Sequence, residues 1–394
     1  MRTVSFFLFV AALAGCDGEP PVTEPVAASA KQTAGGRYRV VAFSSSLGGN
    51  VSAGTSINER GWIAGFSNLP GDTTRHAALW RDGRILDLRT LGGPNSNVQW
   101  PGQNDEGMVV GIAETRKLDP NQEEWSCSAF FPTVTHHVCR GFVWYRGEMK
   151  ALAPFGGTHS FATGINDDGQ VVGWAETTVR DPTCNAPQVL QFRAVQWDAK
   201  NGGRRQLRPL HGDSTSAATA INDLGQVVGI SGDCDIAVGQ LSARHAVIWE
   251  DGKVKEIGDL GGDAWHTPMA ISDRGVVVGF SNPAGVPGIT FQPHAFRWTK
   301  EGGIEDLELL EGHDFSQAFG VNRRGQIVGR SCGPAGCRAV LWENGKLKDL
   351  NNLIGRYDDV LTAARHINDE GRITGNFVEG SSGKTLTFVA IPMN

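Results

Sequence analysis

One short pattern recurs seven times along this chain and constrains its fold more than any other feature. Its first copy reads Ile57-Asn58-Glu59-Arg60-Gly61, and the later copies repeat it with small changes. Successive turn glycines lie 46, 62, 56, 50, 50 and 46 residues apart. Repeats of this length are typical of β-propeller blades. The turn glycines are Gly61, Gly107, Gly169, Gly225, Gly275, Gly325 and Gly371.

Each copy continues in the same order. A short apolar run follows the turn, then a loop of variable length, a run ending in Trp such as His245–Trp249, a polar turn and a last run. Asn and Asp favour tight turns, and Gly accepts a positive φ, so the pattern is typical of hairpins. Val, Ile and aromatic residues fill the runs, and no window has a helical period. We therefore predict four β-strands per copy.

The two ends of the repeat array are incomplete in complementary ways. The seventh copy ends at residues 385–392, with Phe388 near the Trp position and no fourth strand. Residues 38–43 have the pattern of a fourth strand without a blade of its own. A closed ring uses both segments and hides the open strand edges. We predict an all-β fold, a seven-bladed β-propeller of four-stranded antiparallel blades closed by the N-terminal strand.

Two motifs resemble a known family. Residues 164–173 read Gly-Ile-Asn-Asp-x-Gly-x-Val-Val-Gly, and residues 294–298 read His-Ala-Phe-x-Trp. Over about residues 38–394 the chain resembles the HAF family of extracellular bacterial repeats, although the Phe of the second motif is replaced by Ala78 and Val247 in the other clean copies. The resemblance implies an exported, propeller-like body and assigns no activity to named residues.

The first residues have the layout of a bacterial export signal. Arg2 supplies a positive charge before an apolar stretch, and Leu13-Ala14-Gly15-Cys16 resembles the cleavage motif of lipoproteins. An ordinary signal peptide with an incidental cysteine is the alternative. We expect residues 1–15 to be a signal peptide, 16–36 to be the lipidated Cys16 with a flexible tether, and 37–394 to be the propeller. The protein is then an exported lipoprotein, anchored in the outer membrane, at the cell surface or in the periplasm.

The other six cysteines predict disulfides, because an even number in an exported protein is typical of them. Metal binding is the alternative, but no CxxC spacing supports it. Two pairs are local, within one loop and across one short turn. The third joins equivalent loops of neighbouring blades and depends on the blade register. The predicted pairs are Cys127–Cys139, Cys332–Cys337 and Cys184–Cys234.

Enzyme and cofactor motifs are missing from the sequence. No GxSxG, HExxH or phosphate-loop spacing occurs, and the Asn-Asp turns lack the ligand density of calcium loops. A net charge of −6 argues against nucleic acid. We expect no cofactor, no metal and no nucleic-acid partner.

The candidate ligand-binding residues are those at the blade corners that break the repeat. Corners and long loops are predicted to share one face, and aromatic, carboxylate and histidine side chains together suit sugars or peptides. Loops on a rigid scaffold also vary freely, so the same residues fit a surface without a ligand. The candidates are His159, Asp213, Trp265, His266, His313, Asp314 and Tyr357.

We expect a monomeric, membrane-anchored binding module for an unknown extracellular carbohydrate or protein ligand. The alternative is a hydrolase or lyase acting on extracellular polysaccharide. Its site would lie at the channel mouth, with a carboxylate pair contributed by different blades.

Overall fold

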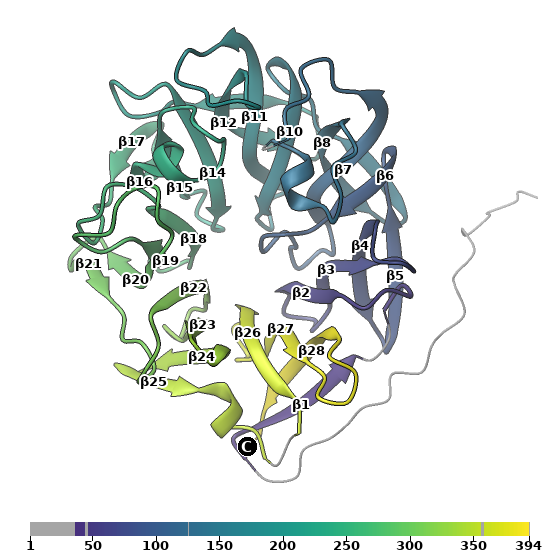
Figure 1. Cartoon of the computed structure of the whole chain (residues 1–394), viewed down its shortest axis with the longest axis vertical. Helices are drawn as coiled ribbons and strands as arrows, with labels where there is room; N and C mark the ends of the chain where they lie inside the picture. Colours follow the sequence, from purple (N-terminus) through teal and green to yellow (C-terminus); the bar gives the residue numbers. More distant parts are fainter. Residues whose placement is uncertain (1–35, 44–45, 125, 356–357, 394) are drawn as a thin grey trace, which may run out of the picture.

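The computed structural model describes residues 36–43, 46–124, 126–355 and 358–393. Seven four-stranded antiparallel sheets stand in a ring around a central axis (Figure 1). This confirms the predicted fold class. Cys16 and Tyr357 lie outside the described residues, so their predicted roles stay predictions.

The strands follow the repeat copy by copy. Blade 1 contains β2 (Ser52–Ile57), β3 (Ile63–Asn68), β4 (Arg75–Arg81) and β5 (Arg84–Arg89); blade 2 contains β6 (Gly92–Asn97), β7 (Val109–Leu118), β8 (His137–Tyr145) and β9 (Glu148–Ala151). Blade 3 contains β10 (Gly156–Ile165), β11 (Gln170–Arg180), β12 (Leu190–Asp198) and β13 (Arg204–Leu207); blade 4 contains β14 (Thr215–Ile221), β15 (Val227–Gly232), β16 (His245–Glu250) and β17 (Lys253–Glu256).

Blade 5 contains β18 (Thr267–Ile271), β19 (Val277–Ser281), β20 (His294–Thr299) and β21 (Gly303–Asp306); blade 6 contains β22 (Phe315–Val321), β23 (Ile327–Gly333), β24 (Gly336–Glu343) and β25 (Lys346–Asp349). Blade 7 contains β26 (Val360–Ile367), β27 (Ile373–Val378), β28 (Thr385–Pro392) and β1 (Tyr38–Phe43). The described residues also form three short 3₁₀ helices: η1 (Ser128–Phe130), η2 (Gln240–Ala243) and η3 (Leu350–Asn352).

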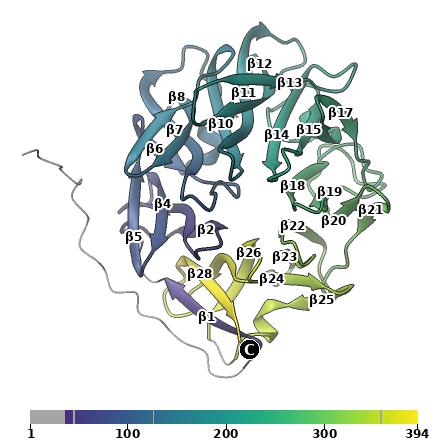
Figure 2. The ribbon, with the colours of Figure 1, turned by 180° about the vertical axis from the view of Figure 1, so that it is seen from behind.

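The N-terminal strand closes the ring as predicted. β1 pairs antiparallel with β28 from Tyr38 opposite Pro392 to Phe43 opposite Thr387. Figure 2 shows the purple β1 beside the yellow β28. Tyr38 and Val40 are buried in the core of blade 7. The last blade is therefore assembled from both ends of the chain.

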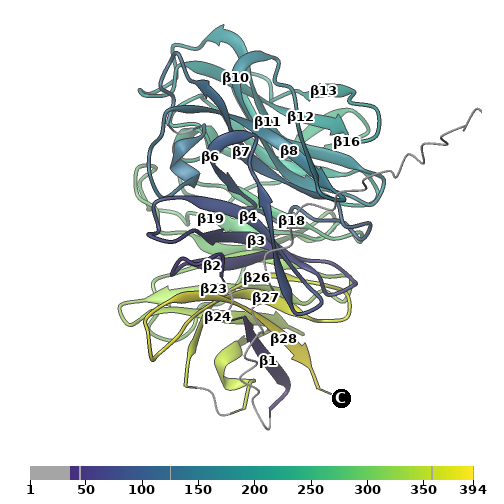
Figure 3. The ribbon, with the colours of Figure 1, turned by 90° about the vertical axis from the view of Figure 1, so that its right-hand side faces the viewer.

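The ring has two distinct faces, which the edge-on view in Figure 3 separates. We call turn face the side with the hairpin turns between first and second strands and between third and fourth strands. We call loop face the side with the second-to-third-strand loops and the corners between blades. The first strand of a blade runs nearest the axis, as β2, β18, β22 and β26 do in Figure 1.

Glycine recurs in every second strand because no side chain fits there. A Cβ atom at Gly173 would lie 1.9 Å from the carbonyl oxygen of Phe161. A Cβ atom at Gly65 would lie 2.0 Å from the carbonyl oxygen of Ala53. The first strand bulges at this level, which brings its backbone against the second strand. The same close approach occurs at Gly111, Gly229, Gly279, Gly329 and Gly375.

The third-strand Trp side chains join adjacent blades. The indole N–H of Trp249 donates to the carbonyl of Arg208 at 2.7 Å, in the segment that leaves blade 3. Trp197 and Trp342 make the same bond to Ala153 and Glu308. A large, flat indole ring can be buried between two blades because its one hydrogen-bond donor has a partner. In blades 1, 4 and 5, a histidine at or next to the start of the third strand pairs with a fourth-strand carboxylate at 2.9 Å: His76 with Asp87, His245 with Glu256 and His294 with Asp306.

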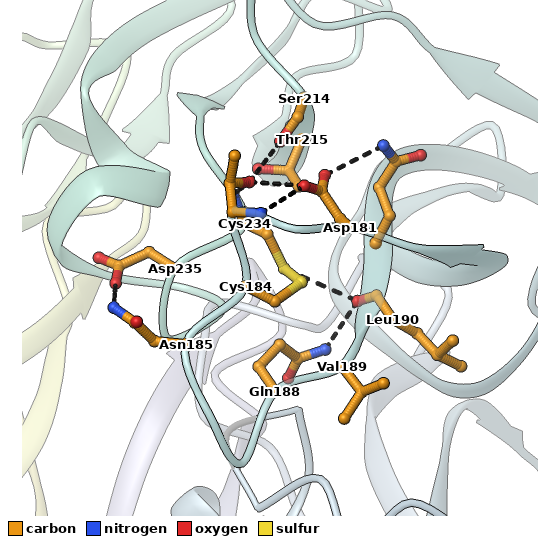
Figure 4. The surroundings of a disulfide bond; sticks show 12 residues. Asp181, Cys184, Asn185, Gln188, Val189, Leu190, Ser214, Thr215, Cys234 and Asp235 are labelled. Atoms are coloured by element: carbon orange, nitrogen blue, oxygen red, sulfur yellow. Dashed lines mark hydrogen bonds between the residues drawn. A yellow bond between two sulfur atoms is a disulfide. The ribbon is translucent and has the colours of Figure 1, made fainter.

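All three predicted disulfides are present. Cys127 bonds to Cys139, Cys332 to Cys337, and Cys184 to Cys234. The last bond links the loop after β11 to the loop after β15, where the Asn185 side chain also donates to Asp235 at 2.7 Å (Figure 4). The blade register inferred from the sequence is therefore correct. The disulfides fit a protein outside the cytoplasm.

Across the described ranges, no helix has the length and apolar character needed to span a membrane.

Candidate functional site

Three of the predicted corner residues make the same structural contact. Each one forms a hydrogen bond with the serine that lies two residues after the strand glycine of the second strand. The hydroxyl of that serine also accepts a backbone N–H from the same corner. These bonds fasten the corner to the blade that it enters. Their role as ligand contacts stays a prediction. The pairs are Asp213 with Ser231 at 2.5 Å, His266 with Ser281 at 2.7 Å and His313 with Ser331 at 2.9 Å.

His266 is buried, and both of its ring nitrogens have partners. Nδ1 lies against Ser281, and Nε2 is 3.1 Å from the carbonyl oxygen of Gly262. Burial lowers the pKa of His266, so the neutral ring is favoured. Asp314 is exposed at the same level of blade 6, and its backbone N–H bonds to the carbonyl of Cys332 at 2.8 Å.

Trp265 begins a row of aromatic rings across the loop face of blades 5 and 6. Its ring centre lies 4.9 Å from that of Phe291, which is 39% exposed and lies 6.4 Å from Phe315. Trp265 itself is half-buried and packs over Gly239, where a Cβ would lie 2.7 Å from the indole. The sequence placed Trp265 correctly on the loop face, and its neighbours come from a different blade loop.

His159 lies in a fully buried polar network under the loops of blades 2 and 3. Its Nε2 lies 3.2 Å from Asp119 Oδ2, and its Nδ1 accepts the backbone N–H of Cys139 at 3.0 Å. Glu176 accepts the backbone N–H of His159 at 2.7 Å. Burial and the charge of Glu176 raise the pKa of the adjacent Glu123. This network ties two loops together.

The oxygens of this network are already occupied by donors. Asp119, Glu123 and His159 lie close enough together to resemble a metal centre. However, Asp119 Oδ2 accepts the N–H of Glu123 at 2.6 Å, and Glu123 Oε1 accepts the N–H groups of Val189 and Leu190. The bond from Cys139 to Nδ1 places the ring proton on Nε2, so that nitrogen has no lone pair for a metal. The cluster is built for hydrogen bonding.

A buried aromatic cluster packs against the first strands of several blades. The chain after β6 inserts Trp100, whose ring centre lies 5.2 Å from Phe161 and 5.9 Å from Trp174. One buried cluster joins Trp100, which follows β6, to first-strand side chains of blades 3, 4, 5 and 6. These first-strand side chains are Phe161, Ala217, Met269 and Phe319.

Blades 6 and 7 contain two arginines that sequence analysis missed. Arg365 and Arg330 lie 4.8 and 5.8 Å from the centre of the Phe319 ring. Arg330 donates to Gln317 Oε1, with Nε at 2.8 Å, and Arg365 Nε lies 3.4 Å from Asn376 Oδ1. Both acceptors are neutral amides. Within the described part of the chain, no carboxylate lies within 4.0 Å of either guanidinium.

The surroundings leave the positive charge of this pair uncompensated. Burial, and then the charge of Arg330, lower the pKa of Arg365 to about 9, and burial lowers the pKa of Arg330. The row of rings from Trp265 reaches the pair, because the Arg330 guanidinium lies 5.8 Å from the Phe315 ring centre. One sequence signal was available: Arg330 follows its strand glycine, where five other blades carry Phe66, Ile112, Trp174, Ile230 and Phe280.

The turn-face mouth of the channel is a cavity of about 180 Å³ ringed by the seven turns between first and second strands, six of which begin with Asn. Each Asn uses Oδ1 to close its own turn and Nδ2 to reach the turn carbonyl of the next blade, as Asn58 does with Trp62 and Asn104. Gln103 stands where other blades carry Ile or Val, and its buried amide has no partner among the described residues.

A second ring, of carboxylates, surrounds the same mouth. Each carboxylate accepts the backbone N–H of the preceding turn, as Asp105 does from Glu59 at 2.8 Å. Burial and the neighbouring carboxylates raise the pKa values of Glu59, Asp167 and Asp223. Arg323 interrupts the ring and bonds to Asp369. The ring comprises Glu59, Asp105, Asp167, Asp223, Asp273 and Asp369.

Comparison with known proteins identifies the fold. No family model matches the chain, and no curated protein matches it. An oligogalacturonate lyase solved in complex with manganese shares 13% identity at a TM-score of 0.50, over 93% of this chain and 96% of that one. The acylaminoacyl peptidase of Pyrococcus horikoshii shares 10% identity at a TM-score of 0.49, over 86% of this chain and 50% of that one.

The β-propeller domain of the Trilobed protease from Pyrococcus furiosus shares 9% identity at a TM-score of 0.48, over 86% of this chain and 93% of that one. This chain spans about half the length of the Pyrococcus horikoshii peptidase. At such low identities the likeness concerns the fold alone. The resemblance to HAF repeats stays a prediction, and the chain is placed among the seven-bladed β-propellers.

Proposed function

We propose that this protein is a monomeric, membrane-anchored extracytoplasmic module that binds an acidic carbohydrate on its loop face. The observation that supports this is the Arg330–Arg365 pair, two largely buried arginines that contact the Phe319 ring and, among the described residues, have no carboxylate partner. Removing a charge from water without a counter-ion is costly. A ligand carboxylate offsets that cost, and the planar guanidinium binds it through two parallel hydrogen bonds.

The neighbouring aromatic rings favour a sugar as the bearer of that carboxylate. Phe291 and Phe315 lie between Trp265 and the arginine pair, and Phe291 is exposed. Exposed rings next to a few fixed polar groups are typical of small-ligand sites. The C–H face of a pyranose packs on such rings while its carboxylate reaches the guanidiniums.

The carboxylates of the blade 4 corner and of the polar network of blades 2 and 3 are engaged in hydrogen bonds, which supports binding over hydrolysis. Glycoside hydrolysis requires two available carboxyl groups about 5–10 Å apart. Asp213 is bonded to Ser231, and Glu123 and Glu176 accept several N–H groups each. A polysaccharide hydrolase or lyase remains the alternative, and product formation distinguishes it from a binding module.

Titration calorimetry with alginate oligosaccharides tests the proposal. Arg330→Gln/Arg365→Gln is expected to weaken binding at least about tenfold, which corresponds to 1.4 kcal/mol. The matched control Arg274→Gln, on the exposed turn face, is expected to bind like the parent protein. Neutral dextran oligosaccharides are expected to bind weakly or not at all.

Three outcomes overturn the proposal. Unchanged binding by the double variant removes the arginine pair from the site. Preference for oligoglutamate over alginate indicates a protein ligand. Release of new reducing ends or unsaturated products from alginate indicates the enzyme.

The anchor has its own test. Cys16→Ser is expected to move the protein from the membrane fraction to the soluble fraction, and mass spectrometry is expected to find no acyl groups on it. Unchanged fractionation would contradict lipidation at Cys16. Light scattering of the detergent-solubilised protein tests the monomer.

A further inference from the structure

A second cavity lies on the opposite face, between the outer parts of blades 1 and 2. It has a volume of about 470 Å³, within the range of about 300–1,000 Å³ that is usual for small-molecule sites. Trp62 and Tyr145 supply aromatic surface and Glu106 supplies one carboxylate. Three guanidiniums line the same space: Arg60, Arg81 and Arg146.

The arginines gather on the two aromatic rings. The guanidinium carbons of Arg60 and Arg81 lie 5.4 and 5.3 Å from the Trp62 ring centre, and that of Arg146 lies 5.0 Å from the Tyr145 ring centre. These distances are those of cation–π contacts. In the described ranges none of the three has a carboxylate within 4.0 Å, although Glu106 lines the cavity, so the lining keeps an excess of positive charge.

The repeat supplies an internal reference for this cavity. The equivalent groove between blades 4 and 5 has Gln226 in place of Trp62, Glu250 in place of Arg81 and Lys300 in place of Arg146. There, Glu250 accepts a hydrogen bond from Gln226 at 2.6 Å and lies 3.7 Å from Lys300 Nζ. The groove between blades 4 and 5 therefore balances its charges internally.

Blade packing does not require the residues of the first cavity. At the position of Trp62, blades 3, 4 and 6 carry Gln170, Gln226 and Gln326, and at that of Arg81, blades 3, 4 and 6 carry Asp198, Glu250 and Glu343. The same backbone thus accepts a neutral side chain and an acid. The aromatic ring and the unpaired arginines are specific to the cavity between blades 1 and 2.

We infer that this cavity binds a pyranose that carries a negative charge. The sugar ring packs against Trp62 or Tyr145, and its anionic group binds Arg81 and Arg146. A uronate carboxylate and a sugar phosphate share this chemistry, because both accept two hydrogen bonds from one guanidinium. The site is independent of the Arg330–Arg365 pair, which belongs to the loop face.

The test uses the Arg330→Gln/Arg365→Gln protein as background, so that the loop-face site does not contribute. Ligand-detected NMR compares methyl glucuronide, glucose 6-phosphate and methyl glucoside. At least one anionic probe is expected to bind, and the pair of anionic probes distinguishes a uronate from a phosphate. Methyl glucoside is expected to bind at least about tenfold more weakly.

Two variants locate the binding. Trp62→Gln introduces the glutamine that blades 3, 4 and 6 carry at this position. Arg81→Gln/Arg146→Gln removes two of the three positive charges that line the cavity. Each is expected to weaken anionic binding at least about tenfold. The matched control, Glu250→Gln/Lys300→Gln, changes the equivalent positions of the balanced groove and is expected to leave it unchanged.

Melting curves check that every variant is folded. If Trp62→Gln lowers the melting temperature strongly, the arginine variant decides alone, because Arg81 and Arg146 are exposed. Absence of anionic binding, equal binding of methyl glucoside, or an equal loss in the control would overturn the inference.

Discussion

Cys184 and Cys234 are joined across the boundary between blades 3 and 4, with their Cα atoms 4.5 Å apart. The bond connects residues 50 positions apart, whereas Cys332 and Cys337 are 5 positions apart. In the chain-entropy view, a longer closed loop restricts the unfolded chain more. The bond between blades is therefore the more stabilising of the two.

Cys184→Ser/Cys234→Ser is expected to lower the free energy of unfolding by about 2–4 kcal/mol. Cys332→Ser/Cys337→Ser is the matched control and is expected to cost less. Urea unfolding of both variants measures the difference. Equal losses would show that loop closure is not the source of the stability.

The Arg37–Glu343 ion pair predicts acid sensitivity of the ring closure. The hydrogen bond from Arg37 lowers the pKa of Glu343 to about 2, below its unfolded value of about 4.3. The pair therefore stabilises the protein above about pH 4.3, and this contribution is lost as the pH falls toward 2. Glu343→Gln is expected to cost about 1 kcal/mol at pH 7, because solvent screens part of the interaction.

Urea unfolding at pH 7, 4 and 2.5 is expected to show this cost shrinking with acid. Glu305→Gln, which removes the partner of Arg297 at an exposed position, serves as control. A cost for Glu343→Gln that does not change with pH argues against the ion pair.

The carboxylate ring predicts the opposite dependence. The raised pKa of Asp167 in the folded protein means that its charged form opposes folding. The stability due to the protonated form is present below the unfolded pKa and is lost as the pH rises through the folded pKa. Asp167→Asn keeps an oxygen that accepts the N–H of Asp105, and is expected to stabilise the protein by about 0.5 kcal/mol at pH 7.

That gain is expected to disappear near pH 3, where the parent carboxyl is also neutral. Thermal melting at the two pH values measures it. Asp168→Asn changes the next residue, which is also exposed, and is the control. A destabilised Asp167→Asn protein at pH 7 would mean that the charged oxygen is the better acceptor.

Two tryptophans of the same region are expected to respond differently to truncation. Trp249 is 4% exposed and bonded to Arg208, so Trp249→Ala is expected to cost about 3–5 kcal/mol. Trp265→Ala is expected to cost less, because the ring is half-buried, and to weaken binding of acidic carbohydrate. Melting and titration of both variants check this, and similar losses of stability would place Trp265 in the core.

The periodic residues made the fold predictable. Turn glycines, strand glycines such as Gly173 and third-strand Trp residues each meet the same steric demand in every blade, so their spacing reports the architecture directly. The complementary chain ends predicted the pairing of β1 with β28, and the equivalence of loops predicted the Cys184–Cys234 bond. Both features follow from register alone.

The candidate site was less predictable, because its determinants lie between blades. That His266 and His313 bond to serines is visible only when the second strands are placed beside the corners. Arg330 and Arg365 belong to different blades, and their shared contact with Phe319 and lack of a carboxylate partner depend on the closed ring. A departure from the repeat, such as Arg330, marks where to look but not what surrounds it.

The entry point of the chain has a mechanical consequence. Tyr38 pairs with Pro392, at the turn-face end of β28, and Arg37 is bonded to Glu343 just before it. A pull on the preceding chain, directed away from the turn face, runs along β1 and loads its six paired positions together in shear. Separating two strands in shear requires the hydrogen bonds between them to break together. The seam that closes the ring therefore resists a pull on the chain that precedes β1, and the loop face points away from that pull.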